Sequence, residues 1–160
     1  MQRLAAIALS LFALSIALVP AGQARENPGT LTTQDYVEIQ QLYARYVHAI
    51  DSGDAEGYAA LFTPDGSFNN NVGRDALVAF IRNRTASGMR HINTSLVITP
   101  TPEGARGAVY NLFINVDTNP TTVTGASQYQ DTLVRTPLGW RFKTRVNTRE
   151  PIPRTAPATP

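Results

Sequence analysis

Apolar residues recur at helical spacing from Thr33 to about Asp51, three or four positions apart, which predicts a helix. Thr32 or Thr33 is suited to cap its start. A second, short helix is expected after Asp54 and a third after Gly73. The apolar stripe of the first helix comprises Ile39, Leu42, Tyr43, Tyr46 and Ile50.

The pattern changes after about Gly88, where apolar and polar residues begin to alternate, as is typical of half-buried strands. A short strand is also expected at Ser67 and Phe68, after a turn at residues 63–66. Helices followed by antiparallel strands predict an α+β fold, in which a curved meander wraps three helices and encloses an apolar cavity. The four long strands are predicted over residues 91–99, 105–116, 123–135 and 140–148.

The two ends of the chain are expected to lie outside this fold. Arg3 precedes an uncharged apolar run, and small residues before the 24/25 bond predict a signal peptide at residues 1–24, cleaved after Ala24. An uncleaved anchor is the alternative, but a run of about 16 residues is short for a bilayer. We therefore expect a periplasmic or secreted protein with a domain at residues 25–150 and a disordered, proline-rich tail at residues 151–160.

Composition excludes several kinds of chemistry. The chain has 160 residues, no cysteine and two histidines, which excludes thiolate nucleophiles and cysteine zinc sites and disfavours a histidine-rich metal site. The net charge of +2 is too small to indicate a nucleic-acid partner. We therefore expect no metal and no cofactor.

Several segments resemble the SnoaL-like branch of the NTF2-like superfamily. The resemblance spans residues 31–149 and implies a cone of three N-terminal helices packed into a strongly curved, mostly antiparallel sheet. Members of this branch include polyketide cyclases, dehydratases, a dehydrochlorinase, steroid isomerases and non-catalytic proteins, commonly as dimers or trimers. The matching segments are Arg45–Asp54, Tyr58–Gly66, Gly73–Arg74, Arg90–His91, Tyr129–Thr132 and Gly139–Phe142.

The resemblance implies catalytic roles for Tyr46, Asp51 and His91. Tyr46 matches a tyrosine that polarises a substrate oxygen, and His91 matches a general base that is hydrogen-bonded by an aspartate at the position of Asp51. The helix dipole disfavours a carboxylate at a helix C-terminus, so Asp51 is not explained by helix stability. The alternatives are a core tyrosine, a turn aspartate and a structural histidine.

The resemblance also indicates residues that would contact the substrate. Arg149 near the end of the last strand is expected to stabilise an anion or leaving group, with Arg145 as the alternative. Steroid isomerases carry a carboxylate base where this chain has Phe68–Asn71, and asparagine cannot act as that base. Asn70 is therefore expected either to bind a polar part of the substrate or to form a loop.

The sequence leaves two hypotheses for the function open. The first is a cofactor-independent lyase or isomerase, in which the Asp51–His91 dyad removes a proton from a small, mostly apolar molecule. The second is a non-catalytic periplasmic module that binds a small ligand or another protein. In either case we expect a homodimer or homotrimer, no nucleic-acid partner and no stable membrane insertion after cleavage.

Overall fold

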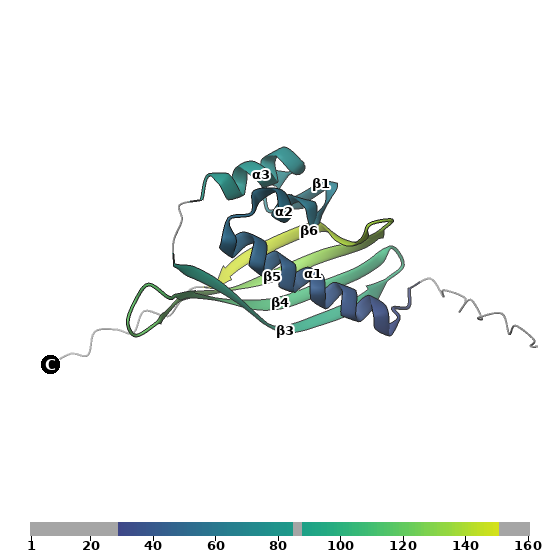
Figure 1. The fold of residues 1–160 in the computed structure, drawn as a ribbon. Helices are drawn as coiled ribbons and strands as arrows, with labels where there is room; N and C mark the ends of the chain where they lie inside the picture. Colours follow the sequence, from purple (N-terminus) through teal and green to yellow (C-terminus); the bar gives the residue numbers. More distant parts are fainter. Residues whose placement is uncertain (1–28, 85–87, 151–160) are drawn as a thin grey trace, which may run out of the picture.

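The computed structural model describes residues 29–84 and 88–150. The predicted signal peptide and the predicted disordered tail lie outside the described residues. Within them, the helices are packed on one side of a twisted sheet (Figure 1). The elements are α1 (Thr33–Ser52), α2 (Ala55–Ala60), β1 (Phe62–Phe68), β2 (Asn71–Val72), α3 (Arg74–Arg82), β3 (Met89–Thr101), β4 (Gly104–Asn115), β5 (Thr122–Thr136) and β6 (Gly139–Glu150).

The start and end of α1 follow from local sequence. The Thr32 side chain accepts a hydrogen bond from the backbone N–H of Asp35, and the Asp35 carboxylate accepts one from the backbone N–H of Thr32. This reciprocal pair is a capping box, which satisfies backbone donors that the first turn leaves free. The helix ends at Gly53, whose φ of 74° is left-handed and suits glycine. The predicted helix from Thr33 is therefore confirmed.

The sheet is a long antiparallel meander extended by a parallel strand. Its order is β2-β1-β6-β5-β4-β3, in which β1 runs parallel to β6 and every other neighbouring pair is antiparallel. The α+β fold and the four long strands are confirmed, each with bounds within two residues of those expected. Within the described residues, no helix is long and apolar enough to cross a membrane.

The turn expected at residues 63–66 is wrong, because these residues belong to β1. The segment is held against β6, where the Phe142 N–H donates to the Leu61 carbonyl and the Asn69 N–H donates to the Arg145 carbonyl. The register with β6 shifts between Phe62 and Ser67, so the turn-forming residues are accommodated as an irregularity within a strand. Pairing with a strand far along the sequence thus overrides local turn preference.

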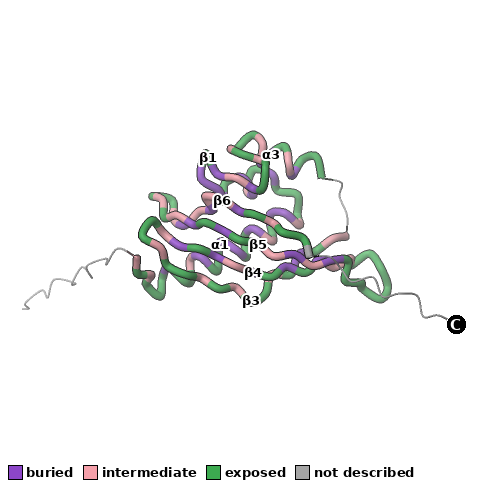
Figure 2. Tube along the Cα trace, turned by 180° about the vertical axis from the view of Figure 1, so that it is seen from behind, coloured by how far each residue is buried: buried purple, intermediate pink, exposed green. Residues whose placement is uncertain are grey.

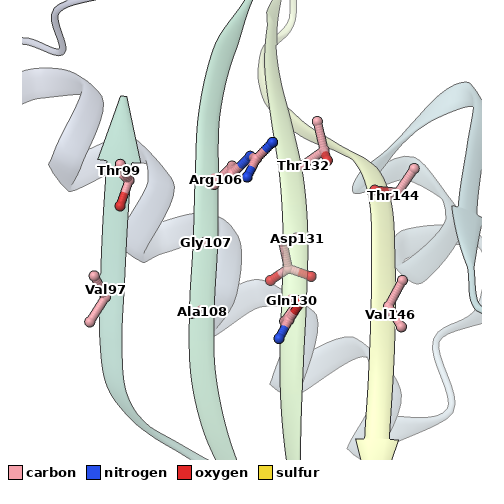
Figure 3. Close-up of a pocket in the computed structure, with 10 residues that line it drawn as sticks. All are labelled: Val97, Thr99, Arg106, Gly107, Ala108, Gln130, Asp131, Thr132, Thr144 and Val146. Atoms are coloured by element: carbon pink, nitrogen blue, oxygen red, sulfur yellow. The ribbon is translucent and has the colours of Figure 1, made fainter. Parts of the chain in front are cut away.

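The sheet has an inner face, covered by α1, and an outer face that no described helix covers. Exposed and buried positions alternate along the strands when the molecule is seen from behind (Figure 2). The outer face carries exposed apolar side chains, among them Val97, Tyr110 and Val146. It also has a groove of about 410 Å³, in which Arg106 and Gln130 line the wall (Figure 3).

Candidate functional site

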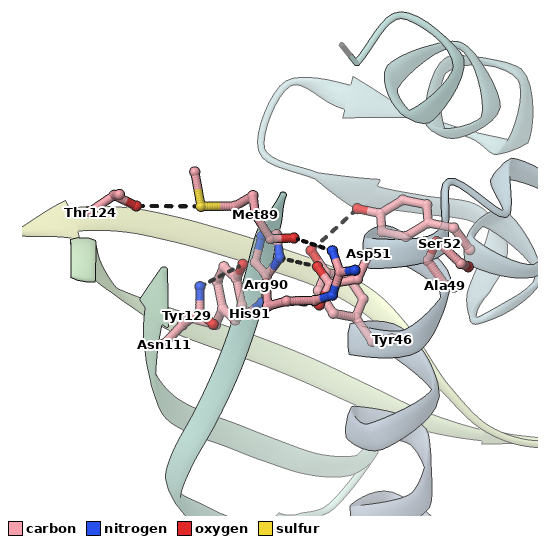
Figure 4. A network of polar contacts seen from close by, with 11 residues as sticks. Tyr46, Ala49, Asp51, Ser52, Met89, Arg90, His91, Asn111, Thr124 and Tyr129 are labelled. Atoms are coloured by element: carbon pink, nitrogen blue, oxygen red, sulfur yellow. Dashed lines mark hydrogen bonds and ion pairs between the residues drawn. The ribbon is translucent and has the colours of Figure 1, made fainter. Parts of the chain in front are cut away.

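The last turn of α1 and the start of β3 bring a carboxylate and an imidazole together. Asp51 Oδ1 lies 2.5 Å from His91 Nδ1, and Asp51 Oδ2 accepts a 3.0 Å hydrogen bond from the His91 backbone N–H. Figure 4 shows the two side chains facing each other across the gap between α1 and β3. The helix dipole disfavours a carboxylate at this position, and these two hydrogen bonds compensate for that cost.

Burial favours the neutral form of His91. The residue is 4% exposed, and its burial lowers the pKa of His91 below the ordinary 6.5, although the hydrogen bond and charge of Asp51 act in the opposite direction. A neutral imidazole beside a carboxylate carries its proton on the nitrogen that faces the carboxylate. Nε2 is then an unprotonated acceptor, and no described residue hydrogen-bonds to it. This nitrogen is the one able to accept a proton near neutral pH.

A pocket of about 430 Å³ lies between α1 and the edge strand β3, beside the dyad. Tyr43 and Val47 of α1 line one wall, and His91 and Asn93 of β3, together with Val109 of β4, line the opposite one. A volume of this order suits a small organic molecule. The position of His91 in its wall places the dyad where such a molecule would bind.

Three tyrosines form a buried cluster on the inner face. The hydroxyls of Tyr46 and Tyr58 lie 3.4 Å apart, and Asn111 donates a 3.3 Å hydrogen bond to the hydroxyl of Tyr129. Burial raises the pKa of all three phenols, so each stays protonated at neutral pH and can donate a hydrogen bond. The structure thus places Tyr46 on the inward stripe, as predicted, and adds Tyr58 as its partner.

Arg145 occupies the core and has no exposed surface. Its guanidinium donates to Asp131 from Nε at 2.8 Å and from Nη2 at 2.7 Å, and it lies 4.0 Å from the ring centroids of both Tyr46 and Phe142. Asp131 also accepts a hydrogen bond from the hydroxyl of Tyr43. The structure therefore gives Arg145 an internal ion pair and packing partners where we expected a contact with substrate.

Arg149 and Asn70 have different surroundings. Arg149 is exposed, and its guanidinium lies 5.7 Å from the ring centroid of Phe113, the ring that also packs against His91 at 5.1 Å. Arg149 is therefore near the dyad, at the rim of the inner face. Asn70 is exposed in the turn between β1 and β2 and makes no described contact with these residues, so its surroundings favour the loop alternative.

Sequence reasoning did not identify Tyr58, Asn111 or Ser127. Asn111 and Ser127 are 0% and 1% exposed and point to the inner face of β4 and β5. The alternation that predicted the strands carries a signal for them, because a polar residue at an inward position stands out between apolar neighbours such as Val109 and Phe113. Among the described residues, no group of three or more histidine, aspartate or glutamate side chains is placed to hold a metal ion.

The fold is that of the NTF2-like proteins, also described as cystatin-like. A family model for the SnoaL-like domain matches residues 32–146, and the chain belongs to this family. The resemblance inferred from the sequence is thereby confirmed. The chain matches none of the curated proteins with which it was compared.

Three solved structures illustrate the similarity. An NTF2-like protein from Novosphingobium aromaticivorans is 29% identical, with 78% of this chain and 86% of that chain covered and a TM-score of 0.67. A protein from Catenulispora acidiphila, in complex with S-DNPA, is 32% identical, with 74% and 95% covered and a TM-score of 0.65. ActVI-ORFA from Streptomyces coelicolor shares the fold at 23% identity, with 72% and 97% covered and a TM-score of 0.65.

Proposed function

We propose that the protein is a cofactor-independent lyase or isomerase that removes a proton from carbon in a small organic molecule. The observation that carries the proposal is the 2.5 Å contact between Asp51 Oδ1 and His91 Nδ1 in the wall of a pocket. It fixes the tautomer in which Nε2 is free to accept a proton, and burial keeps that nitrogen unprotonated near pH 7.

The reaction begins with transfer of a proton from a carbon next to a carbonyl group to His91 Nε2. The electron pair of the broken C–H bond moves toward the carbonyl, and the new imidazolium is stabilised by the Asp51 carboxylate. In an elimination, the pair then forms a carbon–carbon double bond and expels a β-hydroxyl, which takes the proton from His91 and leaves as water. In an isomerisation, His91 returns the proton to another carbon of the same molecule.

Two groups are suited to stabilise the negative charge that develops on the substrate oxygen. Tyr46 has no exposed surface and is not among the residues that line the pocket, but it remains a neutral donor because burial holds its pKa far above the ordinary value, and the proposal requires substrate to reach its hydroxyl. Arg149 is a cation at the rim, beside the Phe113 ring that packs on His91. A general base contributes about 10²–10⁴-fold and an oxyanion donor about 10²–10³-fold, which together suffice for a substrate with an acidic C–H bond.

The proposal extends to export and assembly. The support for export is the order of features in residues 1–24: a positive charge, then an apolar run, then small residues before the expected cleavage site. Mass spectrometry of protein recovered from a periplasmic fraction should give a chain that begins at Arg25. Light scattering on the same material should give the mass of a homodimer or homotrimer, and a monomer would contradict that part of the proposal.

The base is tested with 5-nitrobenzisoxazole, a small aromatic compound whose ring opens to a coloured phenolate when a base removes its C–H proton. We expect the wild-type chain to accelerate ring opening, and His91→Gln to lower the rate about 10²-fold or more. His48→Gln is the comparison variant, because His48 also lines the pocket but is exposed on α1 and makes no described contact with Asp51; it should lower the rate much less than His91→Gln does. Equal rates for the wild type and His91→Gln would contradict the proposal.

A further inference from the structure

A groove of about 530 Å³ lies between α2, the start of β1 and the connection from β5 to β6. It shares no lining residue with the pocket beside the dyad, and two strands, β4 and β5, separate β3 with His91 from β6 with Arg141. A volume of this order suits a small organic molecule, so the groove is a second place where one can bind. Its walls are mainly apolar, with side chains from Ala60, Phe62, Pro64, Pro137 and Leu138.

The polar groups of this groove that remain available to a ligand are positively charged. The hydroxyl of Thr63 donates to Asp65 at 2.9 Å, and the hydroxyl of Thr136 donates to a backbone carbonyl of the same turn at 2.8 Å. Both threonines therefore use their donors within the chain. The other polar side chains in the wall are those of Arg74 and Arg141, and among the described residues that line the groove none is acidic.

Arg141 is half-buried and has no carboxylate partner within the described part of the chain. Its Nη1 donates to the backbone carbonyl of Trp140 at 2.8 Å, which leaves the rest of the guanidinium available. Burial, and after it the positive charge of Arg45, lower the pKa of Arg141 below its usual value. A cation in this position is unfavourable by itself, and an anion bound in the groove would offset both effects.

Arg74 adds to the positive charge on the other side of the groove. Its guanidinium lies 2.6 Å from the carboxylate of Glu56, and Arg82 lies 2.9 Å from the second oxygen of the same carboxylate. One negative charge is thus shared by two positive ones. The groove therefore combines an apolar wall with an excess of positive charge, which is complementary to an anion that carries a long apolar part.

We propose that this groove binds a carboxylic acid with a long alkyl chain, whose carboxylate lies on the guanidinium of Arg141. Arginine presents its N–H groups in a planar fork that matches the two oxygens of a carboxylate. The chain of the acid lies along Phe62 and Leu138, and Leu138, which is 80% exposed, is covered on binding. The site goes beyond the proposed function, because a molecule bound there does not contact His91.

Three probes test the charge and the chain separately: decanoate, decan-1-ol and hexanoate. A merely apolar surface binds the alcohol more tightly than the anion, because an ionised carboxylate is the costlier group to remove from water. The groove should reverse this order. We expect decanoate to bind at least tenfold more tightly than decan-1-ol, measured at pH 7 by NMR titration of the folded chain with the methyl signals of Leu138 as reporter. Decanoate should also bind at least tenfold more tightly than hexanoate, since each fully buried methylene contributes about fourfold.

Two variants locate the site. Arg141→Gln should weaken the binding of decanoate about tenfold or more and leave that of decan-1-ol within about twofold, because it deletes only the charge. Leu138→Ser should weaken both about tenfold, and its exposed position at the turn means that folding does not depend on it. Arg106→Gln is the matched control, because it deletes the same charge from the outer face of β4, outside this groove, and should bind decanoate as the wild type does.

Tighter or equal binding of decan-1-ol would overturn the proposal, and so would wild-type affinity for decanoate in Arg141→Gln or Leu138→Ser. An equal loss of affinity in Arg106→Gln and Arg141→Gln would overturn it as well, because attraction by net charge would then explain the result. Shifts of the His91 ring signals with none at Leu138 would place decanoate in the other pocket. Arg141→Gln should open 5-nitrobenzisoxazole at the wild-type rate, so failure of this proposal is distinct from failure of the proposed function.

Discussion

Replacing Asp51 by asparagine changes the charge of the dyad and keeps its shape. The wild-type carboxylate receives two hydrogen bonds from His91, at 2.5 Å from the ring and 3.0 Å from the backbone. The amide oxygen of asparagine can keep the backbone contact. Its NH₂ group then faces His91 Nδ1 and favours the tautomer with the proton on Nε2, which removes the acceptor that the mechanism needs.

The size of the effect follows from the lost charge. A hydrogen bond to a charged group contributes about 1.5–3 kcal/mol, and the imidazolium formed during proton transfer depends on that contribution. The corresponding loss in rate is about 10- to 150-fold, and the change of tautomer adds to it. We therefore expect Asp51→Asn to open 5-nitrobenzisoxazole about 10²-fold more slowly than the wild type.

A pH–rate profile checks the reasoning behind this number. Burial lowers the pKa of His91, and the hydrogen bond and charge of Asp51 raise it, so their loss should move the acidic limb of the profile to lower pH. The variant should thus combine a lower plateau with an acidic limb shifted downward. An unchanged plateau, or an acidic limb shifted upward, would refute the role given to Asp51.

Two measurements of the free energy of unfolding and one reaction rate provide three further tests. The free energy of unfolding should fall as the pH drops below about 6.5. Burial lowers the pKa of His91 in the folded chain, so the imidazole of the unfolded chain takes up a proton at a higher pH than that of the folded chain. A His91→Gln variant with the same pH dependence would contradict this. Tyr46→Phe should slow ring opening about tenfold with the melting temperature nearly unchanged, and an unchanged rate would exclude Tyr46 from the reaction. Asp35→Asn should lower the free energy of unfolding by about 1.5–3 kcal/mol in urea titrations, because Asp35 accepts a buried hydrogen bond from Trp140, while its bond from the half-exposed Arg135 adds little. A loss below about 1 kcal/mol would contradict this expectation.

The parts of the fold that local sequence determines could be predicted. Thr32 caps α1, Gly53 ends it and the alternation after Gly88 gives the long strands, because each depends on neighbours in sequence. The segment at residues 63–66 could not be predicted in this way. Its partner in the sheet is β6, about 80 residues further along the chain, and pairing at that distance leaves no local pattern.

The candidate site, too, could be predicted from the sequence only in part. Residues Asp51 and His91 are 40 positions apart, so their pairing was expected from family resemblance alone, and the structure brings the two side chains into contact. The surroundings of Arg145 depend on three elements at once, α1, β5 and β6, and the sequence could not show that Asp131 and aromatic rings would enclose it. Ser127 could have been found, since its inward position follows from the alternation of β5.

The central claim is that His91 presents an unprotonated Nε2 while Asp51 holds the proton on Nδ1. The most direct measurement is the ¹⁵N NMR spectrum of the imidazole nitrogens at pH 7, with His48→Gln used to assign the two histidines. We predict that His91 shows a protonated Nδ1 and an unprotonated Nε2. A proton on Nε2, or an imidazolium with both nitrogens protonated, would contradict it.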